Sequence, residues 1–298
     1  MATANESEAP KLEKEDSLIQ SDYIASKLTK NPALSSVFGK GSPLASNWMG
    51  ALTNELTLNE IIMLGSHDSG AFKGEHQYQD ISIRDQLKFG VRLLDFQLAS
   101  HKNDVWLYYG EACMLLGDAT MEIEAFLGSN PNEKVTVVLR NSKTAPDPVK
   151  WVDVKTMFEL GFKSKLVPKE DSGAKLRQMK GSVILIAPKE LEMAENWGED
   201  SMIHHSAPED TNTILGLHDY LLTLSLGDLE VKSPKLVWLE CRSRDVASKR
   251  RSSELQEVQS PSFFGSSEQI YFNVISFSFI NKGHYALVKD YFVKFNKK

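Results

Sequence analysis

Cysteine is scarce in this chain of 298 residues, and its scarcity excludes two kinds of site. The cysteines are Cys113 and Cys241, and neither belongs to a Cys-x-x-Cys pair or lies near a cluster of histidines. A structural zinc site needs closely spaced Cys or His ligands, and a disulfide framework needs several cysteines in a small domain. The sequence therefore predicts two reduced thiols and neither of these sites.

Long apolar runs are missing as well. No stretch approaches the roughly 20 apolar residues of a membrane-spanning helix, and the opening MATANESEAPKLEKEDS lacks the apolar core of a secretory signal. We therefore expect a soluble, cytoplasmic protein, with transient contact at membrane surfaces left open. The basic run at 249–251 offers such a contact with anionic phospholipid, although a short charged run is more often simply solvated.

Positive charge is not in excess either. The chain has 34 basic and 40 acidic residues and a formal net charge of -6, which argues against nucleic acid as a partner because such binding needs clustered Lys and Arg. A glycine-rich phosphate loop and a Gly-x-Ser-x-Gly elbow are also absent from the sequence, so neither a nucleotide-binding protein nor a serine hydrolase is indicated. The sequence does not indicate an oligomeric state.

What the chain does contain is a series of short apolar runs separated by helical patterns. Residues 1–40 lack an apolar period and are predicted to form a flexible N-terminal tail, whereas residues 41–298 are predicted to form one domain. Apolar strands alternating with helices are typical of a parallel sheet covered on both faces, and eight of them predict an α/β fold, a single (β/α)8 TIM-like barrel. The strand candidates lie at 60–64, 91–98, 105–109, 134–139, 182–187, 235–240, 271–278 and 284–292, and the helix candidates at 121–127, 154–160 and 213–224.

The end of the first predicted strand is the first place to expect chemistry. Reactive side chains of such barrels follow the carboxyl ends of the strands. Here EIIML continues as GSHDSGAF, which places His67 and Asp68 directly after the strand, between small residues that would let a ligand approach. A turn histidine without function is the alternative for His67.

From Asn47 to Ser142 the sequence resembles the first half of the X domain of phosphatidylinositol-specific phospholipase C. The shared strings, in order, are NWM, GSHDS at the strand end, ISIRDQLKFGVRLLD, and FLGSNPNEKVTVVL. Each string alone is weak, but together they indicate a divergent member of that family, which implies a barrel of the phospholipase C-like phosphodiesterase type. Beyond Ser142 the resemblance rests on strand order and on an Asp-Tyr ending in the last predicted strand.

The resemblance implies an internal transesterification, in which the inositol 2-hydroxyl attacks phosphorus and expels diacylglycerol. The reaction needs a general base, a cation beside the non-bridging oxygens and a general acid. The family's base is a histidine after the first strand, held by an aspartate of the last strand, and His67 and Asp290 match these positions. Asp68 matches the residue that orients the general acid, with a turn carboxylate that caps backbone N–H groups as the alternative.

At the positions of the family's phosphate-binding cation and general acid, this sequence has different residues. The family's Asp-x-Arg reads Asp95-Phe96-Gln97 here, so an amide replaces the phosphate-binding arginine. These positions offer one carboxylate, too few oxygen ligands for Ca²⁺ or Mg²⁺, and we predict no metal and no cofactor. Tyr109 replaces the general-acid histidine, and a phenol with an ordinary pKa of about 10 suits that role poorly.

Two further strand ends carry candidate ligand-binding residues. Arg140 lies where bacterial relatives have a substrate-facing lysine, and Glu240 lies where they have an inositol-binding aspartate, with a salt bridge to a nearby arginine as the alternative for Glu240. His204 and His205 are predicted to be a solvated pair in a polar loop. The predicted catalytic residues are His67, Asp68, Tyr109 and Asp290, and the predicted ligand-binding residues are Asp95, Gln97, Arg140 and Glu240.

These replacements lead to two main functional hypotheses. Loss of a general acid costs roughly 10² to 10⁴ in rate, and loss of an arginine on the reacting phosphate costs on the order of 10³ or more. The first hypothesis is a protein of the phosphoric diester hydrolase class that is attenuated or non-catalytic and binds an inositol-type or phosphodiester ligand, such as a phospholipid or inositol phosphate. The second is an active phospholipase C-like phosphodiesterase that uses Arg140 and Tyr109. A scaffold that binds nothing small is a third reading.

Overall fold

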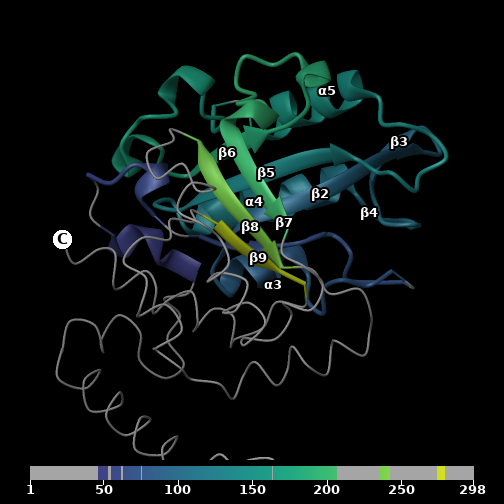
Figure 1. Cartoon of the computed structure of the whole chain (residues 1–298), viewed down its shortest axis with the longest axis horizontal. Helices are drawn as coiled ribbons and strands as arrows, with labels where there is room; N and C mark the ends of the chain where they lie inside the picture. Colours follow the sequence, from purple (N-terminus) through teal and green to yellow (C-terminus); the bar gives the residue numbers. More distant parts are fainter. Residues whose placement is uncertain are drawn as a thin grey trace, which may run out of the picture.

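The computed structural model describes residues 46–52, 55–61, 63–74, 76–162, 164–206, 235–241 and 274–278. Within these residues the chain forms a nine-stranded sheet, three α-helices and several short 3-10 helices (Figure 1). The strands are β1 (Met63–Ser66), β2 (Val91–His101), β3 (Asp104–Tyr108), β4 (Ala112–Leu115), β5 (Lys134–Asn141), β6 (Ser182–Ile186), β7 (Met202–Ser206), β8 (Leu236–Cys241) and β9 (Val274–Phe277). The helices are α3 (Ile83–Lys88), α4 (Leu116–Ser129) and α5 (Trp151–Phe162).

Most of the sheet is parallel, as predicted. The parallel strands follow one another in space as β6, β5, β2, β1, β9, β8 and β7. In the described part of the chain β6 and β7 are not paired with each other, so the sheet is not closed there. The α/β class is confirmed, whereas the complete (β/α)8 barrel stays a prediction. The predicted tail at 1–40, helix at 213–224 and strand at 284–292 lie outside the described residues.

The predicted barrel strand at 105–109 needs correction. β3 runs antiparallel to the end of β2, with His101 opposite Asp104, and β4 runs antiparallel to β3. Lys102 and Asn103 join β2 to β3 with φ angles of 51° and 67°. Such a two-residue turn joins antiparallel strands, whereas a parallel strand needs a crossover of about a dozen residues. The segment is therefore a hairpin at the edge of the sheet, at the right of Figure 1.

The prediction that His204 and His205 lie in a polar loop also needs correction. The segment is not a polar loop but the strand β7, which pairs parallel with β8 so that His204 lies opposite Trp238. Its sequence MIHHS lacks the apolar run by which the other parallel strands were recognised. His204 is therefore held by the sheet rather than being part of a solvated loop.

The core is built around β2 and β5. The first six residues of each strand are fully or almost fully buried, as expected of strands covered on both faces. Helix α4 contacts both α3 and α5. It buries one face, whose spacing of three or four residues is that of an amphipathic helix. The apolar side chains of this face are Leu116, Ala119, Ile123, Phe126 and Leu127.

A buried ion pair lies at the amino-terminal ends of β2 and β5. The Nε of Arg92 donates to Glu133 Oε2 at 2.7 Å, and both side chains are 0% exposed. The guanidinium lies 5.7 Å from the ring centroid of Trp48 and 4.7 Å from that of Phe126, and it donates to backbone carbonyls as well. The buried charge of Arg92 is therefore compensated by the carboxylate of Glu133, by backbone carbonyls and by two aromatic rings.

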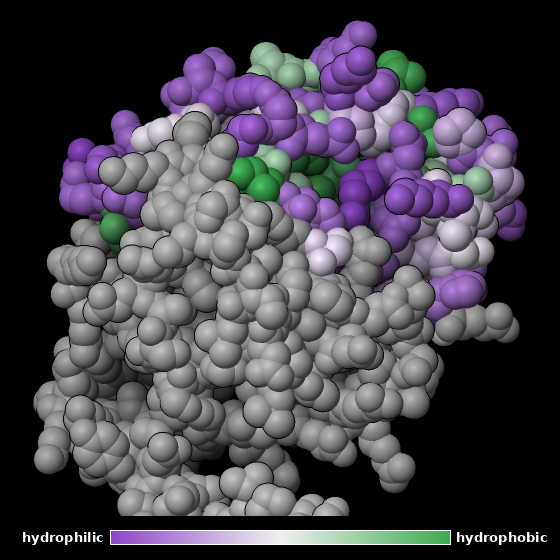
Figure 2. Space-filling model, viewed as in Figure 1, coloured by the Kyte–Doolittle hydropathy of each residue, from purple (hydrophilic) through white to green (hydrophobic). Residues whose placement is uncertain are grey.

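The described surface is mainly hydrophilic on the face seen in Figure 2. Among the described residues, the large apolar side chains that are exposed are Met121, Val152 and Leu160, on the outer faces of α4 and α5. No helix in the described ranges is both long enough and apolar enough to span a membrane.

Candidate functional site

The turn after β1 positions His67 and Asp68. The Ser69 N–H donates to the carbonyl of Asp95 at 2.9 Å, and the Asp95 N–H donates to the Ser69 hydroxyl at 2.8 Å, so the turn is bonded to β2. A Cβ on Gly70 would lie 2.2 Å from the buried side chain of Leu107. The small residues of this turn thus bring His67 against the middle of β2.

His67 lies between carboxylates at both of its ring nitrogens. Its Nε2 is 2.8 Å from Asp68 Oδ2, its Nδ1 is 3.2 Å from Asp95 Oδ2, and its Nδ1 also bonds to Glu240 Oε1. The residue is only 4% exposed. Because ionised carboxylates accept and do not donate, both nitrogens carry a proton in this arrangement.

The pKa of His67 reflects this surrounding. Burial by itself lowers the pKa, but the charge of Asp68 and the hydrogen bonds to Asp68, Asp95 and Glu240 outweigh it and raise the pKa well above the ordinary 6.5. His67 is therefore an imidazolium at neutral pH.

Arg140 supplies the second positive charge of the cluster. It lies on β5 opposite Gln97 on β2, bonds to Asp95 Oδ2 through a guanidinium nitrogen, and lies 3.7 Å from Glu240 Oε1. Burial lowers the pKa of Arg140, but the charges of Asp95 and Glu240 outweigh it and raise the pKa above its ordinary value. Its side chain is 26% exposed, so Arg140 is the cation that a ligand can reach.

Glu240 lies at the centre of the cluster and is fully buried. Besides His67 and Arg140 it contacts His204, whose Nε2 lies 2.7 Å from Oε2, and the hydroxyl of Ser206 at 3.4 Å. Burial raises the pKa of Glu240, but the hydrogen bonds to His204 and His67 outweigh it and hold the pKa well below its ordinary value. The carboxylate is therefore ionised.

The carboxylate of Asp95 is likewise ionised. Burial raises its pKa, but the nearby charge of Arg140 and the hydrogen bond to His67 outweigh it and lower the pKa. The cluster thus sets three carboxylates, those of Asp68, Asp95 and Glu240, against two cationic side chains, those of His67 and Arg140. A buried site with a surplus negative charge is costly, and such sites are commonly functional.

Gln97 and Tyr109 bind to the protein itself. The Gln97 amide donates to Asp68 Oδ1 at 2.7 Å. The Tyr109 hydroxyl accepts from the Gly70 N–H at 3.2 Å and donates to the carbonyl of Asp95 at 3.4 Å. Burial and the charges of Asp68 and Asp95 raise the pKa of Tyr109 well above 10. Tyr109 therefore stays protonated at neutral pH and bridges backbone groups.

Three residues of the cluster could also serve as metal ligands. His67, Asp95 and Glu240 offer ligand atoms that all lie within 4.8 Å of one another. The guanidinium of Arg140 contacts the same two carboxylates, so it already supplies the positive charge that a metal ion would bring.

The structure thus brings together most of the residues that the sequence singles out. The side chains of His67, Asp68, Asp95, Gln97, Arg140 and Glu240 form one connected cluster, and Tyr109 lies beside it. Asp290 lies outside the described residues. His204 was missed; its spacing from Ser206 by two residues, on one face of a strand, was the available signal.

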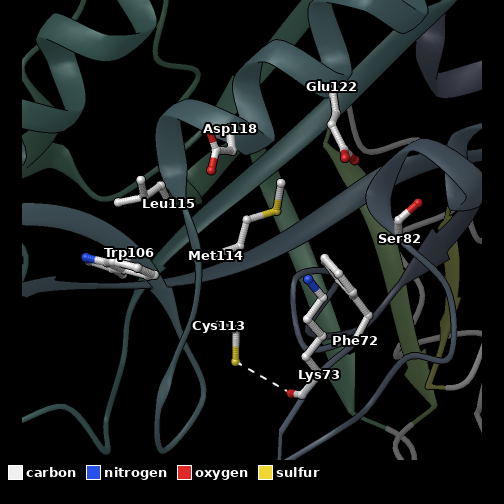
Figure 3. A pocket seen from close by; sticks show the side chains of 9 residues that line it. All are labelled: Phe72, Lys73, Ser82, Trp106, Cys113, Met114, Leu115, Asp118 and Glu122. Atoms are coloured by element: carbon white, nitrogen blue, oxygen red, sulfur yellow. Dashed lines mark hydrogen bonds between the residues drawn. The ribbon is translucent and has the colours of Figure 1, made fainter.

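A separate pocket of about 440 Å³ opens between α4, the β3–β4 hairpin and the loop after β1 (Figure 3). Phe72 and Trp106 contribute apolar surface, and Lys73, Asp118 and Glu122 contribute charge. The described residues that line it include none of the predicted site residues, so this pocket is distinct from the cluster around His67.

Comparison with known proteins agrees with the fold. Residues 55–163 match the family model of the PI-PLC X domain, described as PI-PLC X 1. The PI-PLC X domain-containing protein 1 of Arthroderma benhamiae is 36% identical over 93 residues, which are 28% of this chain and 29% of that protein. The 1-phosphatidylinositol phosphodiesterase of Listeria monocytogenes is 26% identical over 119 residues, 36% of this chain and 37% of that protein. The matches thus span about a third of the length of these two relatives.

Solved structures show the same fold over a longer stretch. The phosphatidylinositol-specific phospholipase C of Listeria monocytogenes superposes with a TM-score of 0.62 at 16% identity, over 83% of this chain and 98% of that one. That of S. aureus superposes with a TM-score of 0.61 at 16% identity, over 83% and 97%. The resemblance seen in the sequence is confirmed, because residues 55–163 match the family model of the PI-PLC X domain and the fold agrees with these structures.

Proposed function

We propose that this phosphodiesterase-like protein binds an inositol-type or phosphodiester ligand at the cluster around His67, and turns it over slowly or not at all. The proposal is carried by His67, whose two ring nitrogens both lie against carboxylates. A general base needs a free lone pair on a ring nitrogen. An imidazolium with two N–H groups has none, so His67 supports binding and charge placement better than proton abstraction.

The other two catalytic tasks lack a suited group as well. Tyr109 is a poor proton donor to a leaving alkoxide, because its pKa is raised and its proton is engaged by the carbonyl of Asp95. Gln97 is neutral and donates to Asp68. Arg140 is charged, but Asp95 and Glu240 hold it. Loss of a general acid alone costs roughly 10² to 10⁴ in rate, which supports an attenuated protein.

The charges of the cluster favour a ligand rich in hydroxyl groups. Carboxylate oxygens accept hydrogen bonds from hydroxyls. Because carboxylates outnumber cations in the cluster, an anionic group is repelled unless it contacts the guanidinium of Arg140. An inositol ring on Asp68 and Glu240, with its phosphate on Arg140, satisfies both conditions. The Listeria relative is named for 1-phosphatidylinositol, which supports a phosphatidylinositol lipid, or the free inositol phosphate with the same headgroup, as the ligand of this chain.

Turnover and binding are tested separately on the purified full chain. Hydrolysis of a fluorogenic myo-inositol phosphodiester is compared with that by the Listeria enzyme, by His67→Ala, and by His101→Gln, a control on the β2–β3 hairpin. Binding of myo-inositol 1-phosphate, myo-inositol and inorganic phosphate is measured by calorimetry, and binding of phosphatidylinositol by flotation with vesicles.

The proposal expects turnover far below that of the Listeria enzyme, together with binding of the inositol phosphate or the lipid that Arg140→Met weakens. Turnover comparable to that of the Listeria enzyme, and abolished by His67→Ala, would instead support the active phosphodiesterase with a rearranged site. Failure of every inositol probe to bind would overturn the binding function and leave a scaffold.

A further inference from the structure

The pocket beside α4 is lined from four parts of the chain (Figure 3). Its residues come from the loop after β1, the residue before α3, the β3–β4 hairpin and the first two turns of α4. Its volume of about 440 Å³ lies within the roughly 300–1,000 Å³ that is usual for small-molecule sites. A hollow lined from several sides suits a small molecule better than it suits the flat surface of a large partner.

Two carboxylates face this pocket from α4. Asp118 and Glu122 are four residues apart, so they lie on the same face of the helix, and both line the pocket. Figure 3 shows both side chains directed from the helix toward the hairpin and the loop after β1. Glu122 Oε2 accepts from the Arg84 N–H at 2.8 Å, and neither carboxylate forms an ion pair with another described residue. Two like charges therefore lie side by side without a cation between them.

The opposite wall of the pocket already holds a positive charge. The Lys73 Nζ lies 5.3 Å from the ring centroid of Phe72, a distance typical of a cation–π contact. Within the described part of the chain Lys73 has no ion pair, so its ammonium lies over the ring and not on a carboxylate of α4. Trp106 adds a second aromatic ring to the lining, and Met114 adds a thioether. This wall thus accepts a cation, which is an observation independent of the two carboxylates.

The composition of the lining restricts the ligand. The charged side chains of the pocket are two carboxylates and one ammonium, so one further positive charge balances them. Carboxylate oxygens accept hydrogen bonds, and a primary ammonium or a guanidinium has several N–H donors with which it can bond to both carboxylates at once. The aromatic rings favour an apolar group on the same ligand. An anion would instead meet two carboxylates of its own sign.

We propose that this pocket binds a small organic cation, in which a primary ammonium or guanidinium group is attached to a short apolar body. The cationic group contacts Asp118 and Glu122, and the apolar body packs on Trp106 and Met114. The site uses no residue of the cluster around His67, so it does not depend on the function proposed for that cluster.

Three probes that share one ring separate charge from apolar contact. They are 2-phenylethylammonium, 2-phenylethanol and 3-phenylpropanoate, which are a cation, a neutral molecule and an anion. Binding to the purified full chain is followed by nuclear magnetic resonance of the labelled indole N–H groups, and Trp106→Phe identifies the signal of Trp106. The cation is expected to shift this signal and to bind about tenfold more tightly than the neutral probe, the size of one hydrogen bond between charged groups. The anion is expected to bind most weakly.

Variants of the charged side chains test which groups hold the cation. Asp118→Asn combined with Glu122→Gln keeps the side-chain shapes, and it should weaken the cation about tenfold while leaving 2-phenylethanol unchanged. The matched control is Asp153→Asn combined with Glu159→Gln on α5, which should change neither affinity. Lys73→Met removes a charge that repels the ligand, and it should strengthen binding of the cation about threefold. Each of these side chains is half-buried or exposed, so the fold should be kept.

Three results would overturn the proposal. The first is that the cation fails to shift the Trp106 signal in the millimolar range, or binds no better than the neutral probe. The second is native affinity for the cation in the Asp118→Asn, Glu122→Gln protein. The third is weaker binding of the cation in Lys73→Met, because that result would assign the ligand to the loop after β1 and not to the carboxylates of α4.

Discussion

Two pairs of oppositely charged side chains connect β2 to the segment of β5, one at the start of β2 and one near its middle, and the two pairs differ in their surroundings. At the amino-terminal end β2 supplies the cation Arg92, and Glu133, directly before β5, supplies the anion; both are buried and bonded to each other. Toward the other end β2 supplies the anion Asp95 and β5 supplies the cation Arg140, within a cluster that holds three carboxylates.

The two ends also differ in how completely their polar atoms are bonded. Arg92 donates to Glu133 and to several backbone carbonyls. In the Arg140 cluster, Asp95 Oδ1 and Arg140 Nε are buried and have no hydrogen-bond partner among the described residues. Removing one partner of a fully bonded buried pair leaves a charge without a partner and lowers the free energy of unfolding strongly. Where polar atoms are already without hydrogen bonds, the cost of their burial is already present in the folded protein. The first end contributes to stability, and the second is the end at which we propose that a ligand binds.

The largest effect is expected at the matched end. Glu133→Gln leaves the charge of Arg92 buried without a partner, and we expect the free energy of unfolding to fall by about 3–5 kcal/mol. Urea denaturation measures the change. Arg92→Met combined with Glu133→Gln should recover much of the loss, because no charge is then left unpaired. A Glu133→Gln protein as stable as the wild type would remove the contrast between the two ends.

The charge of His67 sets the next effect. Its pKa is raised in the folded protein, so its contribution to stability is complete below about 6.5 and is lost as the pH rises toward the folded pKa. Above about pH 6.5 the free energy of unfolding of the wild type should fall with rising pH. Its slope should be steeper than that of His67→Gln by up to about 1.4 kcal/mol per pH unit. Denaturation from pH 7 to 9.5 tests this, with His101→Gln as control. Parallel curves for wild type and His67→Gln would contradict it.

The smallest effect is expected where charge is in surplus. Asp68→Asn removes one of three carboxylates, keeps an oxygen for His67 Nε2, and lets a rotated Gln97 amide accept from the new amide. Asparagine also tolerates the φ of 45° at this position. We expect the free energy of unfolding to change by less than about 1 kcal/mol. A loss as large as that of Glu133→Gln would mean that the cluster is as finely matched as the other pair.

The sequence predicted most of the parallel sheet because its strands are apolar on both faces. It did not predict β7, whose residues MIHHS are polar, because this strand turns His204 toward the cluster. It also placed the segment at 105–109 in the barrel, because an apolar run does not show whether a strand pairs parallel or antiparallel. The two-residue turn at Lys102 and Asn103 makes the pairing antiparallel, and in the sequence this turn is marked only by the polar string SHKND.

The sequence predicted which residues form the candidate site, but not which of them contact one another. The carboxyl ends of parallel strands meet at one edge, so His67, Asp95, Arg140 and Glu240 were expected to converge. Which carboxylate faces which cation depends on distances that a sequence does not contain. Glu240 was predicted to bind an inositol hydroxyl or a nearby arginine. Its bond to His204 comes from the register of β7 with β8, and its contact with His67 comes from the order β1, β9, β8 in the sheet.

The bond between Arg140 and Asp95 has a kinetic consequence. A phosphate that enters the site meets a guanidinium that is already occupied, so binding is an exchange of one anion for another. The carboxylate of Asp95 competes with the phosphate for the guanidinium of Arg140. Because Asp95 belongs to the same chain, its local concentration does not fall when the protein is diluted. Association should therefore be slower than diffusional encounter, and affinity should be reduced by the fraction of molecules in which Arg140 is bonded to its own chain.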